Sequence, residues 1–210
     1  SIKVYFMAHH LGRNNSIYLN FNQEGVLLML SEPLDLSKVN ATELIDFLYA
    51  IFHRDFVASR TLLANKIYIN PKSNQLDDEK ERVFWHLTTK NDKQWQYDNN
   101  GHRTLVDCGR YPDFGRASKL EWVKQILENH DNAEIKLFYH KESTGKKDIR
   151  LYLWAYNYDF VVILQRLGKS QAYLVTSFYI THEGKRKDYE KRYQIYQAKT
   201  DSDLENCEWF

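Results

Sequence analysis

The stretch "DIRLYLWAYNYDFVVILQRLGKSQAYLVTSFYIT", residues 148–181, decides the fold. It holds three runs rich in apolar and β-branched residues, separated by the short turns "YD" (158–159) and "GKS" (168–170). A fourth run, "AEIKLFYHK" (133–141), precedes it across the turn "ESTGKK" (142–147). Turns this short join antiparallel neighbours, whereas parallel strands need a longer crossover, so the sequence predicts a four-stranded antiparallel meander.

Alternation along these strands predicts which side chains share a face. Ile149, Leu151, Leu153 and Ala155 point one way, while Arg150, Tyr152, Trp154 and Tyr156 point the other way. In the last strand, Tyr173, Ser177, Tyr179 and Thr181 share one face, and Leu174, Thr176 and Phe178 share the opposite face. The polar and aromatic face either lies under the N-terminal region or faces a ligand.

Upstream, "CGRYPDFGRASKLEWVKQILENH" (108–130) predicts a turn followed by a helix. A stripe of apolar residues recurs at helical spacing at Ala117, Leu120, Val123 and Leu127. Arg116 and Lys119 project with this stripe in the first turn, where the helix dipole disfavours cations. Two explanations stay open: an anion-binding site at the start of the helix, or a structural ion pair between Arg116 and Asp113.

The first 75 residues have a different pattern. Three strands are expected before residue 32, at 2–8, 16–22 and 25–31. A helix is expected over 40–60, with Asn40 and Glu43 forming a capping box, and a strand over 65–70. The polar stretch "PKSNQLDDEK" (71–80) resembles a linker, so we predict an N-terminal accessory region at 1–75 and a second domain at 76–210. In the second domain, we expect a short helix over 77–90, a loop over 91–103 and a basic helix over 185–199.

Composition narrows the classes of function. The 210 residues carry a net charge of +1, so any nucleic-acid surface must be local rather than global. The two cysteines, Cys108 and Cys207, lack metal-ligand spacing, so we expect a reducing compartment, no metal site and no cofactor. No apolar run reaches the roughly 18 residues of a membrane span, and we expect a cytoplasmic protein without a membrane partner.

Three motifs carry a family resemblance. They are Asp113-x-x-Arg116-Ala117-x-x-Leu120-x-Trp122, the upstream "FWHLTT" (84–89) and the strand "AYLVTSFYI" (172–180). Over residues 77–200, this pattern resembles the phage-associated nucleases of the Barnase/EndoU/colicin/RelE fold. The resemblance implies an α+β fold with helices packed on a four-stranded antiparallel sheet. It also implies a metal-independent ribonuclease, of the kind used as a toxin or effector on mobile elements.

The resemblance places the chemistry on particular residues. His86 is the expected base or acid, since histidine titrates near neutral pH, with His102 and His140 as alternatives. Arg116 is expected to bind the scissile phosphate. Hydroxyl groups that position it are expected from Thr176, Ser177 and Tyr179. Family members carry tyrosine near Phe178, so Tyr179 fits only if a bulge shifts the strand. Further substrate contacts are expected from Arg110, Lys119, Arg150, Lys185 and Arg186.

The expected substrate is RNA, with tRNA as one candidate, cut by attack of the 2′-hydroxyl group. A cognate inhibitor or antitoxin protein is the expected partner. The alternative is a catalytically inactive RNA-binding or protein-interaction module of the same fold.

Overall fold

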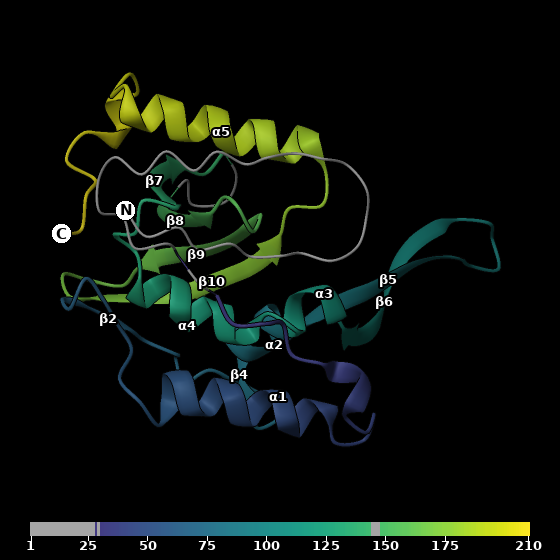
Figure 1. The fold of residues 1–210 in the computed structure, drawn as a ribbon. Helices are drawn as coiled ribbons and strands as arrows, with labels where there is room; N and C mark the ends of the chain where they lie inside the picture. The colour runs from purple at the N-terminus through teal and green to yellow at the C-terminus, as the bar shows by residue number, and fades with distance from the viewer. Residues whose placement is uncertain (1–27, 29, 144–147) are drawn as a thin grey trace, which may run out of the picture.

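The computed structural model describes residue 28, residues 30–143 and residues 148–210 (Figure 1). The strands expected over 2–8 and 16–22 lie outside the described residues, as does most of the strand expected over 25–31.

The main sheet has six strands in the order β1-β2-β10-β9-β8-β7, and it curls into a half-barrel. The strands span Leu62–Leu63 (β1), Ile67–Ile69 (β2), Ile135–Lys141 (β7), Ile149–Ala155 (β8), Phe160–Arg166 (β9) and Gln171–Tyr179 (β10). β7 to β10 form the expected meander, but β2 adds to β10 in parallel and β1 pairs with β2. The predicted four-stranded antiparallel fold is therefore wrong, because a mixed sheet extends the meander at its β10 edge.

Helices cover both faces of this sheet (Figure 1). The α-helices are α1 (Leu44–Phe52), α2 (Arg82–Thr88), α3 (Phe114–Ala117), α4 (Leu120–Glu128) and α5 (Glu183–Gln197). A π-helical turn at His53–Val57 continues α1, and single 3-10 turns lie at Leu36–Lys38 and Ser202–Leu204. Two short strands, β3 (Leu76–Asp77) and β4 (Lys80–Glu81), pair just before α2.

The aromatic face of β8 lies under α5. Tyr152 and Trp154 are buried with Phe138 and Tyr189 of α5, and the rings of Phe138 and Tyr152 stack 5.0 Å apart. The described cover of this face is α5, rather than the N-terminal region or a ligand as expected. The tyrosine stripe of α5 supplies the apolar cover, although the helix is basic elsewhere.

A long hairpin projects from the body between α2 and α3 (Figure 1). It consists of β5 (Thr89–Tyr97) and β6 (Arg103–Pro112), and nearly all of its residues are exposed. Asp98 builds the turn: its carboxylate accepts hydrogen bonds from the backbone N–H groups of Asn100 and His102, both at 2.8 Å. Gly101 takes the positive φ of 77° that the turn requires. The loop expected over 91–103 is therefore wrong, because most of it is β5.

One hydrophobic core joins the two sides of residue 75. Ten buried apolar residues from the N-terminal side belong to the same cluster as Phe84, Leu87 and Val123. They are Leu28, Leu36, Leu44, Leu48, Ile51, Phe52, Phe56, Leu63, Ile67 and Ile69. The domain boundary at residue 75 stays a prediction, but the shared core and the shared sheet lead us to expect one cooperative unit.

Candidate functional site

Several of the residues expected at the site, among them His86, Arg116 and Tyr179, lie where α2, α3, the base of the hairpin and β10 meet. A hollow of about 340 Å³ lies there, and Tyr179, Lys90 and Arg116 line it. A second, more open hollow of about 590 Å³ also contains Lys90 and Arg116, and His86 lines its wall. The two hollows therefore share a rim made of Lys90 and Arg116, which we call the cationic rim.

Asp113 explains the position of Arg116. Asp113 is the N-cap of α3, and its carboxylate accepts a hydrogen bond from the backbone N–H of Arg116 at 3.3 Å. The same carboxylate pairs with Lys90 at 2.9 Å and lies 3.6 Å from Nε of Arg116. Nη1 of Arg116 donates to the backbone oxygen of His86 at 2.7 Å. Arg116 therefore ties α3 to the last turn of α2, whose carbonyl groups lack helical partners.

The apolar stripe of the predicted helix is buried, but the helix is interrupted. α3 ends at Ala117, and α4 begins at Leu120. Both residues are buried, as are Val123 and Leu127. The side chain of Arg116 is only 19% exposed, and burial lowers the pKa of its guanidinium, while Asp113 raises that pKa. A four-residue helix has little macrodipole, so the conflict that the sequence suggested is weak.

His86 lies on α2 beside the cationic rim, and its ring is only partly exposed to solvent. Loss of hydration lowers the pKa of its imidazole below 6.5, and the guanidinium groups of Arg82, Arg110 and Arg116 lower it further. The carboxylate of Asp77 opposes this shift. A lowered pKa favours the neutral ring, which is the protonation state that a general base needs.

Two more expected cations lie near these hollows and are held by aromatic rings. Arg110 pairs with Asp77 at 2.5 Å, and its guanidinium lies 4.7 Å from the ring centre of Trp85. Lys119 donates to the backbone oxygen of Gly115 at 3.0 Å and lies 5.2 Å from the ring centre of Tyr179. Burial lowers the pKa of Lys119.

A bulge in β10 decides which hydroxyl groups face the site. The register shifts between Leu174 and Thr176, so the alternation before Val175 is offset from the alternation after it. Tyr173 therefore shares the face of Thr176, and its expected grouping with Ser177 is wrong. The bulge lies upstream of Phe178, so it leaves Tyr179 one position after that residue and on the other face.

The expected hydroxyl residues of β10 accordingly lie on opposite faces of the sheet. Thr176 lies opposite Ile163, on the face that α5 covers. Ser177 lies opposite Val162 on the other face and is 1% exposed. Tyr179 is 44% exposed and lines the 340 Å³ hollow. Of these hydroxyl residues, Tyr179 is the one that the structure places among the cations.

The remaining expected substrate contacts lie in different parts of the structure. Lys185 lines the 340 Å³ hollow. Arg186 donates to the backbone oxygen of Tyr156 at 3.1 Å and pairs with Asp159, so it fastens α5 to the sheet. Arg150 donates to Gln165 at 3.2 Å on the face of β8 that carries Tyr152. The structure therefore does not bring Arg150 to the cationic rim.

Lys90 and His182 were not among the sequence predictions. Both line the 340 Å³ hollow, and Nδ1 of His182 accepts the backbone N–H of Lys185 to cap α5. The sequence carries no signal for Lys90, because the β5–β6 pairing that places it opposite Tyr111, two residues before Asp113, is seen only in the structure. The alternatives to His86 lie elsewhere: His102 pairs with Asp98 at the hairpin tip, and His140 is on the edge strand β7.

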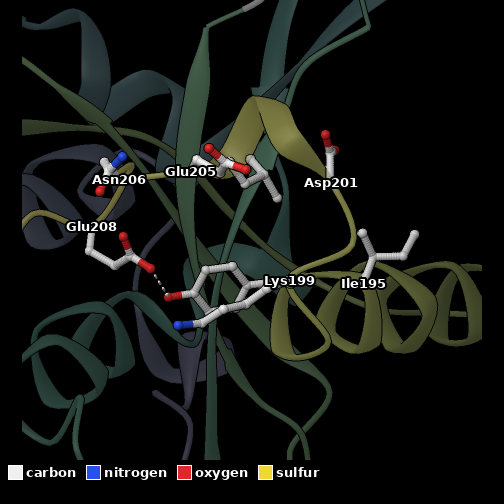
Figure 2. A pocket seen from close by; sticks show the side chains of 8 residues that line it. Ile195, Lys199, Asp201, Glu205, Asn206 and Glu208 are labelled. Carbon is white, nitrogen blue, oxygen red and sulfur yellow. Dashed lines mark hydrogen bonds between the residues drawn. The ribbon is translucent and has the colours of Figure 1, made fainter.

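A further hollow of about 300 Å³ lies at the C-terminal end of α5 (Figure 2). Asp201, Glu205 and Glu208 line it, and the hydroxyl of Tyr196 donates to Glu208 at 3.4 Å. Its carboxylates repel phosphate groups, so it does not fit the expected substrate.

No protein family, curated protein or solved structure matches this chain. The resemblance to the phage-associated nucleases therefore stays a hypothesis. Across the described part of the chain, no helix is long and apolar enough to cross a membrane. Within the same residues, no three His, Cys, Asp or Glu side chains are grouped so that they could hold a metal ion.

Proposed function

We propose that this protein is a metal-independent endoribonuclease of the cytoplasm, acting as a toxin or phage-conflict factor restrained by a cognate inhibitor protein. The observation that carries the proposal is the cationic rim with the imidazole of His86 beside it. Lys90 and Arg116 separate two hollows, with Lys185 in one and His86 in the other. This arrangement suits the phosphate of RNA, with tRNA as one candidate substrate.

In the proposed reaction, neutral His86 removes the proton of the 2′-hydroxyl group, and the resulting oxygen attacks the adjacent phosphorus. The bond from phosphorus to the 5′-oxygen breaks, and that oxygen takes a proton. We assign this proton to Lys119, whose ammonium group lies 5.2 Å from the ring centre of Tyr179 beside the 340 Å³ hollow and has its pKa lowered by burial. Lys90 and Arg116 stabilise the charge of the phosphorane-like transition state. Tyr179 holds the phosphate or stacks on a base.

The second candidate is an RNA-binding module of the same site without catalysis. The existing contacts of Arg116 favour this second candidate, because its side chain already donates a hydrogen bond to the His86 carbonyl and lies beside Asp113. Burial of Ser177 and the position of Thr176 under α5 favour it as well. The two candidates differ in one measurable product, the cut RNA strand.

Cleavage is expected to continue when divalent metal is removed. The full chain, incubated with total RNA in excess EDTA, should yield fragments that end in a 2′,3′-cyclic phosphate and a 5′-hydroxyl. Gel electrophoresis and mass spectrometry of the ends measure this. Binding without any cut supports the inactive module. Cleavage that stops in EDTA and returns with magnesium contradicts a metal-independent mechanism.

The pH dependence is expected to report His86. Only the neutral ring can act as base, so kcat/KM should rise with pH and reach half its plateau below pH 6.5. The sign follows from the lowered pKa of His86, which the three guanidinium groups and reduced hydration cause. Asp77→Asn should move the midpoint lower still, because it removes the carboxylate that raises this pKa. A midpoint above 6.5 in the unaltered chain contradicts this role for His86.

A further inference from the structure

The β5–β6 hairpin carries an unusual concentration of exposed apolar side chains. Within the part of the chain that the structure describes, ten large hydrophobic residues are exposed, and four of them lie on this hairpin. They are Trp95 (53% exposed), Tyr97 (70%), Leu105 (49%) and Tyr111 (49%). Exposed apolar clusters of this kind mark interaction sites more often than chance.

Strand pairing places most of this cluster on one face. Trp95 pairs with Leu105 and Tyr97 pairs with Arg103, so these four side chains lie together. The pair of Gln94 and Val106 and the pair of Gln96 and Thr104 alternate with them and therefore point to the opposite face. The hairpin thus has an aromatic face and a mainly polar face on the same two strands.

The charge of the aromatic face suits a polyanion. Lys93 and Arg103 lie on it against a single carboxylate, that of Asp107. The guanidinium of Arg103 lies 4.2 Å from the ring centre of Trp95, which gives a flat cationic and aromatic surface. Such a surface stacks bases of single strands without regard to sequence. The bases of a duplex already stack on one another, so a double helix cannot use it in this way.

The hairpin is continuous with the cationic rim. Lys93 of the aromatic face lines the 590 Å³ hollow together with His86, and Lys90 and Tyr111, which pair across the base of the hairpin, line it as well. An RNA strand lying along the hairpin would therefore lead into the hollow beside His86. No other described element projects from the body in this way (Figure 1).

We propose that the aromatic face of the β5–β6 hairpin is an arm that stacks the bases of single-stranded RNA and guides the strand to the cationic rim. The proposal rests on the proposed function for the identity of the ligand. Binding by the arm is nevertheless separate from cleavage, because the stacking residues Trp95 and Tyr97 lie outside both hollows.

The test is fluorescence anisotropy with a labelled single-stranded RNA oligonucleotide whose 2′-oxygens are methylated, so that it cannot be cut. The variant Trp95→Ala/Tyr97→Ala should weaken binding by about ten- to a hundredfold, as loss of base stacking does. The matched control Gln94→Ala/Gln96→Ala changes the opposite face of the same strand and should stay within about twofold. Trp95→Phe/Tyr97→Phe, which keeps the rings, should retain most of the affinity.

Each outcome decides the proposal. Equal affinity in the alanine variant and in the control overturns it, and so does the absence of any binding by the unaltered chain, which would leave the arm to a protein partner. Equal sensitivity with a duplex of the same sequence also overturns it, because stacking requires unpaired bases. Strong, arm-dependent binding without cleavage of ordinary RNA supports the arm and contradicts the proposed nuclease. Melting curves confirm that the variants are folded.

Discussion

The fragment 77–210 is expected to be unfolded or insoluble when it is expressed alone. It lacks ten buried apolar residues of the main core, each worth about 1.5–3 kcal/mol of burial. Their loss removes roughly 15–30 kcal/mol, more than the whole stability of a typical domain. It also removes β2 and the following Asn70, whose backbone N–H donates to the Ala172 oxygen of β10 at 2.7 Å. Circular dichroism and a proteolysis time course on the fragment measure the outcome.

Point variants in α1 also test whether the residues before position 75 belong to the main core. Leu48 is fully buried, whereas its neighbour Phe47 is 39% exposed. Leu48→Ala should lower the free energy of unfolding by about 2–5 kcal/mol, and Phe47→Ala should lower it much less. A folded fragment 77–210, together with a harmless Leu48→Ala, would show that residues 1–75 are a separate accessory region, as the sequence predicts.

Arg116→Ala should reduce both cleavage and stability. If the guanidinium stabilises the transition state, its loss should slow cleavage by about 10²- to 10³-fold. The same change leaves the His86 carbonyl without its 2.7 Å donor, which should cost about 1–3 kcal/mol of folding free energy. Lys90 still pairs with Asp113 at 2.9 Å, so that carboxylate is not left unpaired. Melting temperature and the rate of cleavage well below it should be measured on one sample.

A second arginine separates the two effects. Arg54 forms a two-point ion pair with Asp55 and a further pair with Glu121 at 2.9 Å, outside both hollows. Arg54→Ala should lower the melting temperature while the cold rate stays unchanged. If Arg116→Ala behaves in the same way, Arg116 is a structural tie between α2 and α3 and not a phosphate ligand.

The sequence predicts those helices and strands that bury one face or both faces in the core. β8, β9 and β10 have apolar runs bounded by short turns, and α4 has a buried stripe at Leu120, Val123 and Leu127, so local pattern identifies them. The sequence does not predict β5 and β6. Both faces of the hairpin they form are exposed, so their side chains show no apolar alternation. The parallel pairing of β2 with β10 escapes because nothing local encodes a partner so far along the chain.

The sequence predicts some residues of the site and misplaces others, for a related reason. Arg116 lines one hollow with His86 and the other with Tyr179, because short segments carry these three residues to neighbouring parts of the fold. Thr176 and Ser177 could not be assigned from alternation, since a bulge at Val175 resets the period. Arg150 and Arg186 looked available as lone cations, but Glu142 and Asp159 already lie near them in the fold. Sequence gives the charge of a side chain but not its neighbours.

The pairing of β2 with β10 has a consequence for the order of events during synthesis. The side chains of Asn70 and Gln171 hydrogen-bond at 3.0 Å although 101 positions separate them. Such distant contacts form late, because the intervening chain loses entropy before they are made. A nascent chain that ends before β10 has neither this pairing nor Tyr179 at the cationic rim. The hollow beside α3 is therefore assembled only after translation has passed the last strand, so a nascent chain that is still shorter lacks the finished site.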